Sequence, residues 1–310
     1  MTRKIFKFQP DETKLLKQYE PKIKYINGYD INNRTTRIDI EDIGDGKNVP
    51  VIRYKIFDDC GDIVHGFSTR LGGVSKEHLA SMNLSFSRGD ERENVIENHI
   101  RFAKAVGYDY TKLVFSDQVH DVKIHNVTIE DVGKGICNES DITGIDALVT
   151  NVTNIPLITF FADCVPLYFY DPVQKVIALA HSGWKGTVKK IGSLVVKYMT
   201  ENYGTAPEDV LCAIGPSICM DCYEVSADVA EAFSTAYSVE QINSMLYDKG
   251  NGKYQLDLHK ACIYNLTDAG VSEEHIALPD MCTCCNSGIL FSHRASKGMR
   301  GNLAAVLMMK

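Results

Sequence analysis

The hydrophobic positions of the chain follow helical and strand periods in turn from about Val51 onward. Apolar residues at three- and four-residue steps predict helices, and glycines such as Gly204 and Gly270 directly after them favour termination. The four predicted helices span Asp90–Val106, Thr187–Tyr203, Ser226–Tyr237 and Asp257–Ala269. Apolar, β-rich runs such as Val210–Ile214 lie between them and are typical of buried strands. This alternation predicts an α/β or α+β domain.

The first fifty residues have a different character. They are rich in Lys, Asp, Asn and Gly, and their apolar positions keep neither period for long. We therefore predict an N-terminal extension over residues 1–50 and one domain over residues 51–310.

The segment Leu157–His181 contains two β-rich runs around the turn signal Asp171–Gln174. If these runs form one antiparallel hairpin with Tyr170 opposite Lys175, Cys164 falls opposite His181 on the same face. Directly opposed residues have Cβ atoms about 5 Å apart, close enough to share a cation.

A thiolate and an imidazole suit zinc, and His120, after the β-rich run at residues 113–115, can supply a third ligand. Three protein ligands leave one position open, which is typical of a catalytic site. The alternative is that Cys164 is a small core residue and His181 a hydrogen-bonded one. The loop after His181, Ser-Gly-Trp-Lys-Gly, favours the functional interpretation because function concentrates in such loops.

The composition narrows the class of protein. A chain of 310 residues with 45% hydrophobic residues is long enough to bury a core and enclose a pocket. The net charge of -7 argues against nucleic acid as a partner. No apolar run has the length of a signal peptide core or a membrane span, so we expect a cytoplasmic protein with no membrane partner and with its ten cysteines reduced.

Other segments offer groups for an anion or a sugar. Arg70 stands beside the glycine pair at residues 72–73, which predicts either an anion cradle or a plain turn with a solvated Arg. Asn83 is suited to hydrogen-bond a sugar or to cap the following helix. A group of five cysteines is a candidate second zinc site, although Cys-x-Cys-Cys is not a usual zinc-knuckle spacing, and buried thiols are the favoured interpretation. These cysteines are Cys219, Cys222, Cys282, Cys284 and Cys285.

Several motifs in sequence order resemble one family. They include His-Gly-Phe-Ser-Thr-Arg-Leu-Gly-Gly-Val-Ser at 65–75, Gln-Val-His at 118–120, Asp-Ala-Leu-Val-Thr-Asn at 146–151, Ala-Asp-Cys-Val-Pro at 162–166, Ala-His-Ser-Gly-Trp-Lys-Gly at 180–186 and Phe-Ser-His-Arg at 291–294. Together they are similar to the laccase-domain family, also called YfiH-type or multicopper polyphenol oxidoreductase. The resemblance runs from about Val51 to Lys310.

The resemblance implies packed mixed β-sheets flanked by helices, and zinc bound at the positions of His120, Cys164 and His181. It also implies phosphorolysis of the purine nucleosides adenosine, inosine and S-methyl-5'-thioadenosine, with adenosine deamination alongside. Lys185 departs from the family motif, where an Arg is usual. The sequence does not determine the oligomeric state, and a homodimer is compatible with it.

Particular residues fit these reactions. Asp163, beside the thiolate ligand, is the candidate carboxylate for moving protons during deamination, as in other zinc deaminases. Neighbours on a regular strand point to opposite faces, so this role needs a bulge near Pro166. For phosphorolysis, Arg70 and Lys185 are the candidates that hold phosphate beside the ribose. The cations of Phe-Ser-His-Arg at 291–294 and Arg300 either line the same pocket or are surface charge.

Three other functions remain open. One is a copper polyphenol oxidase (laccase), which requires a histidine-rich ligand set, whereas the nine histidines contain no His-x-His pair. A second is a Cys-His hydrolase editing peptidoglycan precursors, with Cys164 as nucleophile and His181 as base. The third is a non-catalytic module stabilised by zinc.

Overall fold

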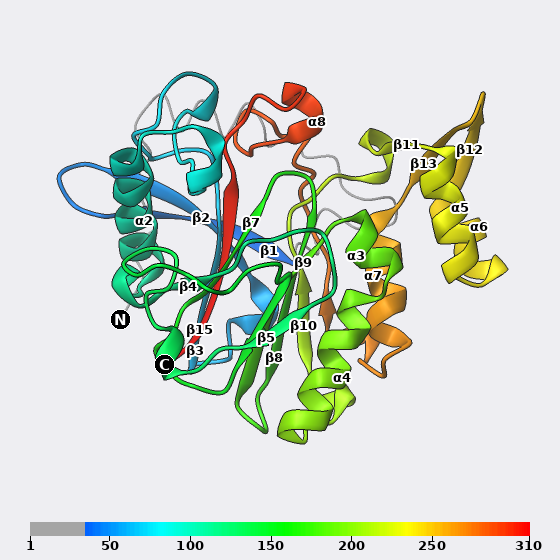
Figure 1. Ribbon diagram of the computed structural model, residues 1–310, viewed down its shortest axis with the longest axis horizontal. Helices are drawn as coiled ribbons and strands as arrows, with labels where there is room; N and C mark the ends of the chain where they lie inside the picture. Colours follow the sequence, from blue (N-terminus) through cyan, green and yellow to red (C-terminus); the bar gives the residue numbers. More distant parts are fainter. Residues whose placement is uncertain (1–34) are drawn as a thin grey trace.

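Two six-stranded β-sheets pack face to face and helices cover both outer faces, in a computed structural model that describes residues 35–310 (Figure 1). The strand order of the first sheet is β1 (Thr36–Asp42), β2 (Asn48–Tyr54), β3 (Ile63–Ser68), β15 (Leu303–Met309), β7 (Leu157–Phe161) and β4 (Val114–Phe115). Its neighbours are antiparallel except β4 and β7, which are parallel.

The second sheet is also mixed. Its order is β14 (Ile276–Ala277), β10 (Leu211–Ile214), β8 (Val165–Asp171), β9 (Val176–Ser182), β6 (Ala147–Thr150) and β5 (Ile124–Asn126). The two edge pairs are parallel and the inner pairs antiparallel. A small antiparallel sheet of β11 (Glu224–Ser226), β13 (Lys253–Leu256) and β12 (Leu246–Gly250) stands apart, at the upper right of Figure 1.

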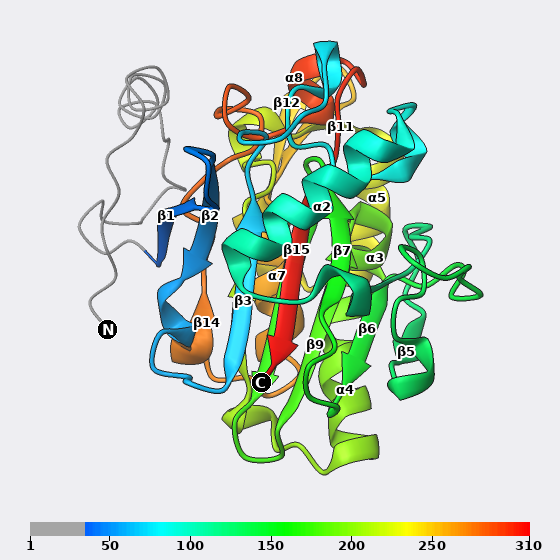
Figure 2. The same cartoon turned by 90° about the vertical axis from the view of Figure 1, so that its left-hand side faces the viewer.

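The helices cover the two outer faces. Helix α2 (Arg92–Val106) packs on the first sheet, as Figure 2 shows from the side. Helices α3 (Trp184–Val188), α4 (Ile191–Tyr203) and α7 (Leu258–Thr267) cover the second sheet. Helices α5 (Ala227–Ala236) and α6 (Val239–Met245) adjoin the small sheet, and the short α8 (His293–Ser296) precedes β15. The predicted α/β architecture of packed mixed sheets flanked by helices is confirmed.

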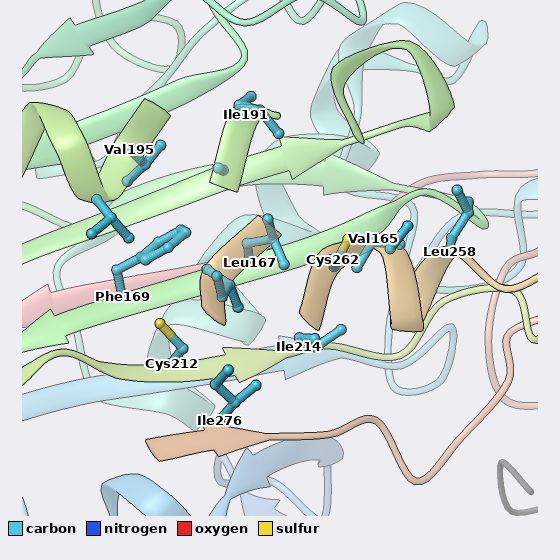
Figure 3. Close-up of a cluster of buried hydrophobic side chains, with 14 of the residues drawn as sticks. Val165, Leu167, Phe169, Ile191, Val195, Cys212, Ile214, Leu258, Cys262 and Ile276 are labelled. Atoms are coloured by element: carbon cyan, nitrogen blue, oxygen red, sulfur yellow. The ribbon is translucent and has the colours of Figure 1, made fainter. Parts of the chain in front are cut away.

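Strand β8 illustrates how both faces of a sheet are buried. Because side chains alternate along a strand, Val165, Leu167 and Phe169 point to the helices while Tyr168 and Tyr170 point into the space between the sheets. In Figure 3 the first three lie against residues of α4 and α7. Burial of such a side chain contributes roughly 1.5–3 kcal/mol, so this alternation stabilises both cores at once.

Three of the four helix predictions are confirmed as α2, α5 and α7, and the predicted strand at residues 210–214 is β10. The fourth prediction, Thr187–Tyr203, is wrong as a single helix. Lys190 has a φ of 65°, and this left-handed residue separates α3 from α4. Helix α3 also begins earlier than predicted, at Trp184.

The predicted boundary at residue 50 falls inside a strand. Strand β1 pairs with β2 along its whole length, so residues 36–50 are part of the first sheet. In β1, Arg37 and Asp39 form an ion pair on one face of the strand. Ile38 and Ile40 pack inward from the other face. Such a short alternation of charged and apolar residues is hard to recognise in a segment rich in polar residues. The remainder of the predicted extension lies outside the described residues. None of the helices that the structure describes could cross a lipid bilayer.

Candidate metal centre and adjoining pocket

The predicted hairpin over Leu157–His181 is wrong in two respects. Strand β7 belongs to the first sheet and β8 to the second, so residues 162–164 carry the chain from one sheet to the other. In the true hairpin of β8 and β9, Pro166 pairs with His181, two residues away from the predicted register. The reason is that Asp171 is still paired, with Val176, and the loop begins one residue later.

Because the register error is an even number of residues, it leaves the face unchanged, and Cys164 still lies near His181. The side chains of His120, Cys164 and His181 converge, with their donor atoms within 4.8 Å of one another. Cys164 Sγ is 3.8 Å from His120 Nε2. The two imidazole rings meet edge to face with centroids 4.7 Å apart. The three predicted ligands are therefore brought together.

Asp146, for which the sequence suggested no role, holds two of these side chains in place. Its Oδ1 accepts a hydrogen bond from His181 Nδ1 at 2.7 Å and from the His120 main-chain N–H at 3.0 Å. Its Oδ2 accepts from the N–H groups of Val119 and Asp121. The first bond turns Nε2 of His181 toward Cys164. A carboxylate behind a metal-binding imidazole is the usual arrangement in such sites, and Asp146 begins a motif that could have suggested it.

The main chain is unusual at the ligands. His120 has a φ of 62° and Asp163 a φ of 85°, a region that non-glycine residues rarely occupy. Gly183 passes so close that a Cβ there would stand 2.7 Å from His120 Cδ2 and 3.3 Å from Cys164 Sγ. Such backbone conformations cluster at functional sites, where the surrounding structure maintains them.

The opposite charges of Cys164 and His181 stabilise each other. Burial raises the pKa of Cys164, but the charge of His181 and a hydrogen bond from His120 outweigh it and lower the pKa to about 6. Burial lowers the pKa of His181, but the Cys164 thiolate and the Asp146 carboxylate raise it to about 9. The thiolate that a metal requires is thus favoured at neutral pH. One sulfur and two imidazole nitrogens form a donor set that fits zinc.

A pocket of about 590 Å³ adjoins this centre, and His120, Cys164 and His181 form part of its wall. Another part of the wall is aromatic. The rings of Phe86 and Phe115 are stacked with centroids 6.1 Å apart, and Phe160 meets Phe115 edge to face at 5.1 Å. A volume and an apolar wall of this kind suit a small organic ligand.

Cationic side chains line the same pocket. Arg88 and Arg300 each have a buried Nε that lacks a hydrogen-bond partner in the described part of the chain. Burial and the nearby charge of Arg88 lower the pKa of Arg300 to about 10. Burial and the charge of Arg300 also lower the pKa of His293, another lining residue. Unpaired donors and mutually repelling cations favour the binding of an anion.

Asp163 lies in the pocket wall, on the segment that crosses between the sheets. Its Oδ1 accepts from the Thr283 hydroxyl at 2.6 Å, and its Oδ2 accepts from the Arg294 N–H at 2.7 Å. The positive φ of this residue provides the local irregularity that the sequence analysis required near Pro166. Both carboxylate oxygens are consequently held in fixed positions.

Three other predicted site residues are not among those that line the pocket. The guanidinium of Arg70 donates to the carbonyl oxygens of Ala80 and Ser287. Asn83 is buried, and its amide donates to Asp90 Oδ2 at 2.9 Å. Lys185 is exposed on α3, with its ammonium over the ring of the neighbouring Trp184. Arg300, His293 and Arg294 do line the pocket, as the sequence suggested, whereas Arg88 was missed because it stands in no distinctive motif.

Comparisons with known proteins agree on one family. A family profile described as multi-copper polyphenol oxidoreductase laccase matches residues 64–310. Purine nucleoside phosphorylase YlmD of Bacillus subtilis is 36% identical over 250 residues, which cover 80% of this chain and 89% of the relative. YlmD of Geobacillus stearothermophilus, also named a purine nucleoside phosphorylase, is 35% identical over 246 residues, 79% of this chain and 89% of the relative.

Solved structures give the same result. The crystal structure of the Bacillus licheniformis hypothetical protein YfiH aligns with a TM-score of 0.79 at 31% identity, covering 84% of this chain and 96% of that one. The crystal structure of YlmD from Geobacillus stearothermophilus aligns with a TM-score of 0.77 at 32% identity, with the same coverage.

Proposed function

The chain belongs to the multi-copper polyphenol oxidoreductase laccase family, and from this premise we propose that it is a zinc-dependent purine nucleoside phosphorylase. Its substrates are adenosine, inosine and S-methyl-5'-thioadenosine, with adenosine deamination as a second activity. The observation that carries the proposal is the presence, in one pocket, of the Cys-His-His centre and two half-buried arginines, each with a buried Nε that lacks a hydrogen-bond partner among the described residues. The relatives named purine nucleoside phosphorylase support it.

Phosphorolysis breaks the bond between C1' of the ribose and N9 of the purine, while a phosphate oxygen forms the new bond to C1'. The reaction therefore requires that a dianion and a nucleoside be held side by side. We assign the phosphate to Arg88 and Arg300, because these two residues line the pocket. Arg70 and Lys185, the candidates from the sequence, are not among the lining residues. The aromatic wall of Phe86, Phe115 and Phe160 is suited to the flat purine.

His120, Cys164 and His181 would hold the zinc ion. Zinc bound there supplies a Lewis acid and leaves a position free for substrate. Asp163 keeps the proton-transfer role predicted for deamination, because its carboxylate lies in the pocket beside Cys164 and its orientation is fixed by Thr283 and Arg294. The thiolate of a zinc enzyme must stay reduced, which fits the predicted cytoplasmic location.

The competing functions have less support. A multicopper oxidase requires several histidine-rich sites, whereas the second metal-binding group found among the described residues consists of cysteines alone. A Cys-His hydrolase would use Cys164 as a free nucleophile. In that case iodoacetamide should alkylate Cys164 in the metal-loaded protein, and our proposal expects protection.

The proposal is tested with purified protein, inosine, and phosphate present or omitted. We expect hypoxanthine and ribose 1-phosphate to form only when phosphate is present; equal hypoxanthine formation without phosphate would contradict phosphorolysis. The metal content of the same preparation, measured by mass spectrometry, should be zinc rather than copper. Adenosine is then supplied without phosphate to measure inosine formation as the deaminase activity.

Substitution of Arg300 tests the phosphate site. Arg300→Gln removes a charge-assisted hydrogen bond of about 1.5–3 kcal/mol, so the KM for phosphate should rise about 10- to 100-fold. Deamination, which consumes no phosphate, should change much less. Lys185→Gln is the matched control, because it removes the charge of an exposed cation that does not line the pocket. An equal effect of both substitutions on the KM for phosphate would refute the assignment.

A further inference from the structure

Two loops bring four cysteines together outside the Cys-His-His centre. Cys219 and Cys222 follow β10, and Cys282 and Cys285 lie between β14 and α8. Their sulfur atoms all lie within 4.8 Å of one another. Cys222 Sγ is 3.4 Å and Cys219 Sγ 4.0 Å from Cys285 Sγ. Each loop thus contributes a Cys-x-x-Cys pair, and the intervening Cys284 is not part of the cluster.

The spacing of the sulfur atoms matches a tetrahedral zinc site. With Zn–S bonds of about 2.3 Å, sulfur atoms at the corners of a tetrahedron are about 3.8 Å apart. The two distances to Cys285 Sγ lie on either side of this value. Disulfide-bonded sulfurs would be about 2 Å apart, and the ten cysteines are all free thiols.

The contacts of sulfur distinguish the cluster from other buried cysteines of this chain. Cys212 and Cys262 lie in the same helix-covered core as the four clustered cysteines, and the Cys262 thiol is 3.8 Å from the Ser182 hydroxyl. In the cluster, by contrast, main-chain N–H groups point at sulfur: those of Cys219 and Cys285 donate to Cys282 Sγ at 3.2 and 3.4 Å. Such N–H···S bonds stabilise thiolates and are typical of the surroundings of metal ligands.

We propose that Cys219, Cys222, Cys282 and Cys285 bind a second zinc ion, as a structural site separate from the Cys-His-His centre. On binding, each thiol releases its proton to solvent and its sulfur forms a bond to the ion. Four protein ligands fill the tetrahedron and leave no position for substrate, so the site is structural rather than catalytic.

The position of the cluster indicates what this ion stabilises. Thr283, between the two cysteines of the second pair, donates its hydroxyl to Asp163 in the pocket wall. Arg294, whose main chain also contacts Asp163, donates from its guanidinium to the Cys222 carbonyl oxygen at 2.8 Å. Loss of the ion should therefore loosen the wall that holds Asp163, although the cluster itself touches no reacting atom.

The experiment measures bound zinc in the full chain after dialysis against metal-free buffer. We expect two zinc ions per chain in the unsubstituted protein and one in the double variant Cys222→Ser/Cys285→Ser. Cys284→Ser is the matched control, because it alters a neighbouring thiol outside the cluster, and it should retain both ions. Equal zinc content in the double variant and the control would overturn the proposal, as would disulfide bonds among the four cysteines.

If the double variant does not fold, a second measurement tests whether the four cysteines bind a metal ion. His181→Ala removes a ligand of the first centre, so cobalt added to this variant in place of zinc should occupy mainly the cysteine cluster. Strong sulfur-to-cobalt charge-transfer absorption of a tetrathiolate site is then expected. In the unsubstituted protein, the four cysteines should resist iodoacetamide until a chelator is added. Absence of both signals would refute the site whether or not the protein cleaves nucleosides.

Discussion

Asp146 is fully buried behind the candidate metal centre and accepts hydrogen bonds from the His181 imidazole and the His120 main-chain N–H. Burial alone raises the pKa of this carboxyl, but hydrogen bonds from His181 and from the Asp121 N–H lower it below its usual value. The folded structure thus holds Asp146 as an anion that orients His181. Loss of such an outer carboxylate usually weakens metal binding about 10- to 100-fold.

We therefore expect Asp146→Asn to lower the affinity for zinc by about one to two orders of magnitude, measured by competition with a chromogenic chelator. Asp121→Asn is the control, since it changes an exposed carboxylate whose main-chain N–H still donates to Asp146. The same affinity in both variants would show that Asp146 does not position the ligands.

His99 gives a prediction on pH-dependent stability. It is fully buried on α2, and burial lowers its pKa to about 4, opposed by a hydrogen bond to the Leu84 carbonyl oxygen. In the unfolded chain the pKa is about 6.5. Above pH 6.5 His99 is mostly neutral in both the folded and the unfolded chain. Below pH 6.5 the unfolded chain binds the proton first, because its His99 has the higher pKa. The free energy of unfolding therefore falls as the pH decreases.

At pH 5 this difference is worth about 2 kcal/mol relative to pH 7. We expect His99→Gln, which keeps a donor for Leu84, to lose less stability over this range than the unsubstituted chain, as measured by urea unfolding. The exposed His78 provides the control, and His78→Gln should lose as much stability as the unsubstituted chain. The prediction fails if His99→Gln loses as much stability between pH 7 and pH 5 as the unsubstituted chain.

Residue chemistry was sufficient to select His120, Cys164 and His181 as candidate ligands, and the fold brings these three side chains together. For the phosphate it favoured Arg70 and Lys185, with Arg300 only a further candidate for the pocket wall, and it did not indicate Arg88. Arg70 stands beside two glycines and looks like an anion cradle, yet its guanidinium holds two carbonyl oxygens. Arg88 and Arg300 are distant in sequence and become neighbours only in the folded chain. Pairing of this kind has no local sequence signal.

At the scale of elements, the predicted register of the β8–β9 hairpin was wrong, but the predicted face of its side chains was right. The register was wrong by two residues because Asp171 was assigned to the turn, whereas its carboxylate accepts from the N–H groups of Val173 and Gln174 while its main chain stays paired. A shift by two keeps every side chain on its face, so the ligands still converged. The passage of the chain between sheets was missed because both strands are continuous apolar runs.

The junction of β9 and α3 provides a test of how closely the centre is packed. Gly183 has a φ of -70°, which any residue can adopt, so Gly183→Ala acts through its added Cβ alone. That atom would stand 2.7 Å from His120 Cδ2 and force the ring to move. We expect zinc affinity to fall about tenfold or more, with circular dichroism unchanged. Gly186→Ala, three residues later inside α3 and with its nearest contact at 3.3 Å, is the control. Equal zinc affinity in both variants would contradict the prediction.

At the scale of the whole molecule, the alternation of periods predicted the layered α/β architecture, because strands and helices that must cover one another leave that alternation in the sequence. The edge strand β1 was missed because its exposed face carries charges that resemble those of a linker. The net charge of -7 left room for a local basic pocket that binds a small anion. A total charge does not show where cations gather, and the fold brings Arg88 and Arg300 to one pocket, each with a buried Nε.

These two arginines lead to a prediction for the stability of the whole chain. An anion that binds only the folded state stabilises it by mass action, by about 2.7 kcal/mol at a hundred times its dissociation constant. Phosphate should therefore raise Tm by about 5 °C or more in a thermal unfolding experiment, while sodium chloride at equal ionic strength should not. Arg300→Gln should remove most of this shift and Lys185→Gln should retain it. If phosphate raises the Tm of Arg300→Gln as much as that of the unsubstituted chain, phosphate binds elsewhere. The guanidinium of Arg300, whose buried Nε lacks a partner among the described residues, would then contribute nothing to phosphate binding.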